Sequence, residues 1–134
     1  MGSVRHEDWP VRLDEVIDRA RNRPFKWGQH DCGTWAAEIV FSLTGEKLDL
    51  PKGYRSARGS LLAMRRKTGS STMAGATSYF LGEPLATPLL AQRGDIVLHK
   101  SQALGVCVGA EVFCLSEAGL SSVPLTECQT AWRV

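Results

Sequence analysis

The stretch Trp27-Gly28-Gln29-His30-Asp31-Cys32-Gly33-Thr34-Trp35 joins a turn that contains glycine to the beginning of an apolar segment. Apolar residues then recur at intervals of three and four positions, which is the spacing of a helix that buries one face: Trp35, Ala36, Ile39, Val40 and Leu43. Gly45 follows Thr44, where a residue in the left-handed conformation often ends a helix. We therefore expect a helix from about Asp31 or Cys32 to Thr44, with the thiol in its first turn.

The composition is that of one globular domain. The chain has 134 residues, of which 43% are hydrophobic and 22% are charged, and its net charge is +2. This charge is too small to favour a nucleic-acid partner, and no window of 18 apolar residues predicts a membrane span. Residues 1–9 lack the apolar core of a signal peptide, so we expect synthesis in the cytoplasm and a leader that is flexible or bound to a partner.

Helical patterns fill the first half of the chain and strand patterns fill the second. We expect further helices at about 10–21, at 56–67, and from a cap at 70–72 to residue 80 or 81. Short apolar runs separated by turn residues predict strands at 96–98, 104–108, 112–115, 120–124 and 130–134. The predicted class is α+β, with helices packed on a small, mostly antiparallel sheet whose apolar face the Cys32 helix covers.

Cys32 is the candidate nucleophile. Unpaired N–H groups and the dipole at a helix N-terminus favour the thiolate, although many cysteines are simply small buried residues. A nucleophilic thiol needs a base, and the chain offers His30 and His99 besides His6 in the leader. Asp31 has two readings, since it can orient His30 or cap the helix.

Several motifs together suggest a family. Trp27-Gly28-x-x-Asp31-Cys32 opens a helix, Gly94-Asp95-Ile96-Val97 begins a strand, and Ala103-Leu104-Gly105-Val106-Cys107-Val108-Gly109 follows. In this combination the chain, from Phe25 to Leu115, resembles the NlpC-type papain-fold cysteine peptidases of bacterial cell walls, and most of all their small relatives in phage tail tips.

The resemblance implies a papain-like fold, peptidoglycan stem peptide as substrate, other tail-tip proteins as partners, and a place in the virion tail. The spacing of the cysteines and histidines calls for no metal, and we expect no cofactor. In that family a histidine begins the strand that matches Leu104-Gly105-Val106, but this chain has Ala103 there. The third, polar residue of the family would fall at Phe113, Cys114 or Leu115, none of which orients an imidazole well.

One strand register offers a substitute base. If residues 100–102 form a three-residue hairpin loop, His99 lies opposite Ala103, Val97 opposite Gly105 and Asp95 opposite Cys107. His99 could then project into the place that Ala103 leaves empty.

Two functions remain open from the sequence. The first is a cysteine peptidase with Cys32 as nucleophile and His99 or His30 as base. The second is an inactive structural protein of the tail tip or baseplate, which the missing histidine favours.

The remaining candidates have simple structural explanations. Trp27, Trp35 and Gly33 are candidates for substrate binding, although a role in the core explains tryptophans equally well. Burial in strands explains Cys107, Cys114 and Cys128, and their spacing does not call for an iron–sulfur site. The basic run 65–67 is expected to be a solvated helix face.

Overall fold

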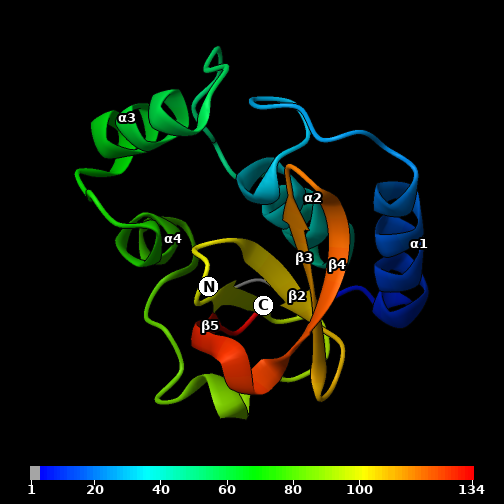
Figure 1. The fold of residues 1–134 in the computed structure, drawn as a ribbon. Coiled ribbons are helices and arrows are strands. Elements are labelled where there is room, and N and C mark those ends of the chain that lie inside the picture. The colour runs from blue at the N-terminus through cyan, green and yellow to red at the C-terminus, as the bar shows by residue number, and fades with distance from the viewer. Residues whose placement is uncertain (1–3) are drawn as a thin grey trace.

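The computed structural model describes residues 4–134, which form four helices and a five-stranded sheet (Figure 1). The helices are α1 (Trp9–Arg21), α2 (Cys32–Thr44), α3 (Ala57–Thr68) and α4 (Met73–Leu81). The strands are β1 (Ile96–His99), β2 (Leu104–Cys107), β3 (Glu111–Ser116), β4 (Gly119–Pro124) and β5 (Cys128–Trp132). The α+β class is therefore confirmed, and the predicted boundaries differ by two residues at most, at both ends of the last strand.

The sheet has the order β4-β3-β2-β1-β5, and all neighbouring strands are antiparallel. The register of the β1–β2 hairpin agrees with the predicted one, because Val97 lies opposite Gly105. The three-residue loop is closed by a hydrogen bond from the His99 N–H to the Ala103 carbonyl, at 2.9 Å. Gln102 in this loop has φ of 74°, the left-handed conformation that follows a turn in such hairpins.

The two faces of the sheet belong to two separate apolar clusters. Residues at alternate positions of β1 and β2, such as Ile96 and Val106, pack with α1 and α2, as the period of two in strands requires. The intervening positions, such as Val97 and Cys107, face a smaller cluster that includes Leu125 and Cys128. In Figure 1, α1 lies on one side of α2, and α3 with α4 lies on the other.

Sequence signals at both ends position α2. Asp31 caps its first turn, and Gly45 ends it with φ of 78°. The apolar stripe from Trp35 to Leu43 is buried against α1, β2 and β3. The Cys32 helix therefore covers one face of the sheet, as the pattern predicted.

Asp95 joins the two ends of the described chain. Its buried carboxylate accepts hydrogen bonds from the Gln92 N–H at 2.8 Å and the Val134 N–H at 3.0 Å. Arg5 donates to it at 3.1 Å, and Arg133 lies 3.3 Å away. The guanidinium of Arg5 also donates to the Val134 carbonyl, at 2.8 Å.

These contacts change the expectation for the leader. Residues 4–8 pack on the domain through Arg5 and through the His6 N–H, which donates to the Leu43 carbonyl at 2.7 Å. The described part of the leader is thus held by its own chain, because a buried carboxylate needs cations and N–H groups around it. The first three residues of the predicted leader lie outside the described residues.

We predict that Asp95→Asn lowers the free energy of unfolding by about 3 kcal/mol, because it leaves two arginines without their buried counter-charge. Asp14→Asn is the matched control, since Asp14 pairs with Arg93 at an exposed site, where ion pairs contribute little. Urea denaturation of both variants measures the difference. Equal effects would contradict a special role for Asp95.

Candidate functional site

The Asp31 carboxylate organises the turn before Cys32. One oxygen accepts the Thr34 N–H at 2.9 Å, and the Thr34 hydroxyl accepts the Asp31 N–H at 2.9 Å, which completes a capping box. The other oxygen accepts the Gly28 N–H at 2.8 Å and the Tyr54 hydroxyl at 2.6 Å. Of the two readings of Asp31, the structure supports the cap.

Gly28 allows the turn to pass close to the loop that carries Tyr54. Its φ is +81°, and a Cβ atom there would lie only 2.5 Å from the Tyr54 carbonyl oxygen. Burial, together with the hydrogen bond to Asp31, raises the pKa of Tyr54 far above its ordinary value. Tyr54 therefore stays protonated and donates to Asp31.

Cys32 is half-buried, and backbone groups near the start of α2 act on its thiol. Those of Leu104 and Gly33 favour the thiolate, as expected at a helix N-terminus. Burial acts in the opposite direction and is the largest effect, so the pKa of Cys32 is raised above the ordinary thiol value, and the nearby Asp31 adds to the rise. The thiol is therefore protonated at neutral pH.

His99 is engaged elsewhere. Its Nδ1 lies 2.8 Å from the Ser101 hydroxyl, and its Nε2 lies 2.8 Å from a carboxylate oxygen of Glu127. Because the Ser101 N–H also points to Nδ1, at 3.2 Å, this nitrogen is the acceptor and Nε2–H donates to Glu127. The hairpin register is as predicted, but both ring nitrogens of His99 are occupied away from Cys32.

His30 is no better placed to act as a base. It is 3% exposed, and its Nε2 has no hydrogen-bond partner within residues 4–134. Burial and the nearby Arg23 lower the pKa of its ring, so His30 is neutral. Within the described residues, neither His30 nor His99 is among the groups that shift the pKa of Cys32.

The three predicted substrate-binding residues lie in different surroundings. Trp27 stacks edge-to-face on Phe25, with ring centroids 4.8 Å apart, and lines an open cleft of about 680 Å³. Trp35 is 1% exposed and belongs to the main core, so it is not a wall of this cleft. Its apolar neighbours on α2 already indicated burial, since they share its helical face.

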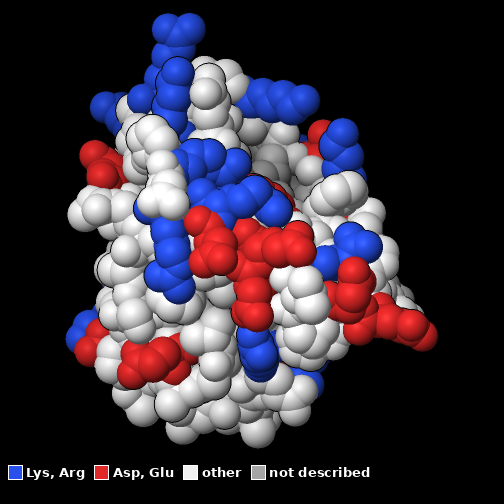
Figure 2. All heavy atoms as spheres, turned by 90° about the vertical axis from the view of Figure 1, so that its right-hand side faces the viewer, with Lys and Arg blue, Asp and Glu red and all other residues white. Residues whose placement is uncertain are grey.

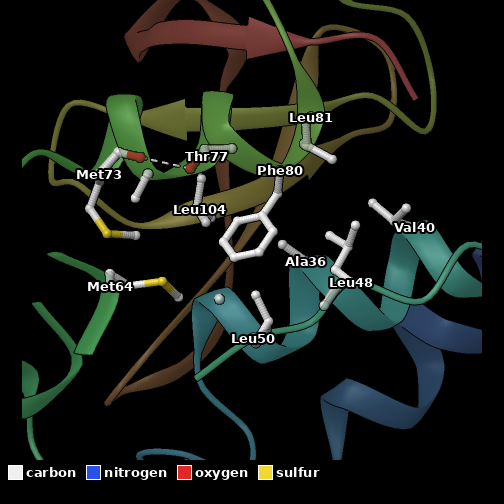
Figure 3. A pocket seen from close by; sticks show the side chains of 13 residues that line it. Ala36, Val40, Leu48, Leu50, Met64, Met73, Thr77, Phe80, Leu81 and Leu104 are labelled. Carbon is white, nitrogen blue, oxygen red and sulfur yellow. Dashed lines mark hydrogen bonds between the residues drawn. The ribbon is translucent and has the colours of Figure 1, made fainter. Parts of the chain in front are cut away.

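Gly33 lines a small apolar cavity of about 30 Å³ between α2, α3 and α4. Figure 3 shows the side chains of Met64, Met73 and Phe80 directed into the space above α2. This volume is close to the share of one water molecule in the liquid, which is far below that of a substrate pocket.

Sequence reasoning missed the other residues of the open cleft. Tyr54, Arg55 and Glu117 line it together with Lys26 and Trp27. No local motif marks these residues, because they come from separate loops that only the tertiary fold brings together.

Cys107, Cys114 and Cys128 are buried free thiols in the second apolar cluster. Burial raises the pKa of Cys114 to about 12 and that of Cys128 to about 11. Residues 4–134 contain no group of three or more histidine, cysteine or acidic side chains arranged to hold a metal. Packing therefore accounts for these three residues.

The fold and this site define an α+β domain with a capped central helix whose first turn carries a half-buried cysteine, and with an open cleft lined by the turn before that helix. The chain belongs to the family described as "Domain of unknown function (DUF6950)", whose pattern it matches over residues 4–134. No match was found among curated proteins. None of the helices within residues 4–134 has the length and apolar character needed to cross a bilayer.

We predict that Asp31→Ala lowers the free energy of unfolding by about 2 to 4 kcal/mol, because the cap is lost and two buried donors lose their acceptor. Tyr54→Phe should cost about 1 kcal/mol. In the double variant the two losses should not add, with a coupling of about 1 kcal/mol between neighbours. Chemical denaturation of the four proteins measures this coupling, and strict additivity would contradict the hydrogen bond.

The raised pKa of Cys32 predicts slow reaction with iodoacetamide at neutral pH, because only the thiolate reacts. The rate should continue to rise above about pH 8.5, the ordinary thiol pKa. Mass spectrometry of the labelled protein follows Cys32, and Cys32→Ala identifies its signal. An inflection below pH 7 would contradict the protonated thiol.

Proposed function

We propose that this chain is a structural component of a phage tail tip or baseplate, with a papain-like, NlpC-type fold whose peptidase site is degenerate. One observation carries the proposal: Cys32 lies in the first turn of α2, while both ring nitrogens of His99 are hydrogen-bonded to Ser101 and Glu127, and His30 is buried and neutral. The α+β architecture, with a central helix packed on an antiparallel sheet, supports the proposed fold.

A cysteine peptidase needs a thiolate, a base, and a group that orients the base. Here the thiol is protonated, and His99 has both ring nitrogens hydrogen-bonded elsewhere. Ala103 has no group that accepts a proton. The geometry therefore supports the structural candidate better than the peptidase.

The backbone around Cys32 nevertheless keeps features that a nucleophile would use. The N–H groups of Leu104 and Gly33 point toward the sulfur. Ala103 itself packs against the second apolar cluster, so the side chain of a histidine at position 103 would have to turn back over the start of β2 to meet the thiol. The proposed papain-like fold nevertheless requires that a histidine at position 103 can interact with the thiol of Cys32.

We predict that Ala103→His lowers the pKa of Cys32 and raises its alkylation rate at pH 7 at least tenfold, because an imidazolium stabilises the thiolate. Ala103→Asn is the matched control for side-chain size, and it should leave the rate unchanged. Alkylation kinetics across pH measure the effect. An unchanged Cys32 in a folded Ala103→His variant would contradict the papain-like placement.

The unaltered chain should release no soluble fragments from purified peptidoglycan, and Cys32→Ala should behave identically. Release that disappears in Cys32→Ala would overturn the structural proposal in favour of the peptidase. If the activity disappeared in His99→Ala as well, His99 would be the base. If it disappeared only in His30→Ala, the base would be His30.

A further inference from the structure

Basic residues are concentrated in one part of the chain. Between Asp49 and Glu83 the sequence has six basic residues and no acidic one: Lys52, Arg55, Arg58, Arg65, Arg66 and Lys67. The chain has 16 basic and 14 acidic residues, so the rest carries ten basic residues against all 14 acidic ones. Although the net charge of the whole protein is small, α3 and the loop before it are therefore strongly positive.

Helix α3 is weakly buried. Met64 is its single buried residue, and α3 packs chiefly on α4, at the edge of the molecule in Figure 1. Leu61 and Leu62 are 49% and 45% exposed. A helix that turns two leucines to solvent while burying one side chain has an outer face for which the domain itself supplies no partner.

Arginines surround these leucines. Arg65 follows Leu61 by four residues and Arg66 follows Leu62 by four, so each pair lies side by side on the helix surface. Arg58 precedes Leu62 by the same interval. Favourable interaction with the helix dipole explains cations in the last turn, but it does not explain exposed leucines between them.

These cations are largely unpaired within the domain. Lys67 pairs with Asp49 at 2.8 Å, whereas Arg58, Arg65 and Arg66 form no salt bridge within residues 4–134. Figure 2, which views the molecule from the side of α1 and so away from α3, shows by contrast acidic and basic side chains next to one another. The surface therefore offers both positive charge and apolar area to a ligand.

We propose that the outer face of α3, formed by Arg58, Leu61, Leu62, Arg65 and Arg66, docks onto an acidic surface of another protein that has an apolar centre. The proposal rests on the proposed function, because a virion subunit is held by its neighbours. Arginine is enriched in protein interfaces relative to the rest of the surface, and the fully buried part of an interface is more apolar than its polar rim. A nucleic acid would need the cations but not the leucines, since phosphate contacts dominate its affinity.

The probe is a synthetic helical peptide with leucines at intervals of three and four residues and glutamates on both sides of them. A scrambled peptide of the same composition, duplex DNA, and phosphatidylglycerol vesicles serve as comparisons. Fluorescence anisotropy should give an affinity for the ordered peptide at least tenfold higher than for the scrambled one. Vesicle and DNA binding should be weaker than peptide binding in 150 mM salt.

Arg65→Glu with Arg66→Glu should weaken peptide binding at least tenfold. The matched control is Arg19→Glu with Lys47→Glu, two exposed cations elsewhere whose reversal gives the same net charge. Leu61→Ser with Leu62→Ser should also weaken binding at least tenfold, and this loss should persist at high salt because it is apolar. Far-ultraviolet circular dichroism checks that each variant is folded.

Absence of peptide binding, equal losses in the control, or stronger binding to DNA or vesicles would overturn the docking proposal. Cys32→Ala should bind the peptide normally, since the thiol is not part of this face. If the protein digested peptidoglycan and still bound the peptide, the proposed structural function would be overturned, but the docking proposal would stand. If the protein failed to bind the peptide but also digested no peptidoglycan, the docking proposal would be overturned and the proposed structural function would stand.

Discussion

The turn before α2 depends on one buried carboxylate. Asp31 accepts hydrogen bonds from Gly28, Thr34 and Tyr54, which belong to the turn, the first helical turn and a distant loop. Each of these donors is partly or fully buried, and an unpaired buried donor costs about 1 to 3 kcal/mol. This single group therefore fixes where the helix begins, and hence where the thiol of Cys32 lies.

The position of the Asp31 carboxylate also helps to explain why the pKa of the Cys32 thiol is not lowered. A helix N-terminus lowers a thiol pKa when the site is open to water or faces a cation. Here the capping carboxylate brings negative charge close to the sulfur, and burial removes the water that would stabilise a thiolate. A favourable helix position is therefore insufficient without the positive charge of an imidazolium.

Local patterns predicted the elements of this fold well. The cap at Asp31, the stop at Gly45 and the alternation in the strands are all properties of neighbouring residues, so the sequence displays them directly. The same holds for the Val97–Gly105 register, which follows from the length of a hairpin loop.

Properties that depend on distant residues were not predictable in this way. The partner of His99 is Glu127, 28 positions away, and no pattern around His99 indicates it. The leader was expected to be flexible or bound to a partner. Arg5 nevertheless binds the buried Asp95, a contact across 90 positions that only the assembled sheet creates.

Asp31 and Asp95 also clarify what the resemblance to papain-like peptidases rests on. Both belong to the motifs that carry it, and each accepts several hydrogen bonds in the interior. Replacing either would leave buried donors or cations unpaired, whereas alanine at position 103 leaves none. The two aspartates in the motifs that suggest the resemblance are therefore residues that this fold needs for its own stability. Under the proposed papain-like fold, a histidine at position 103 would serve catalysis alone, so its absence costs the fold nothing.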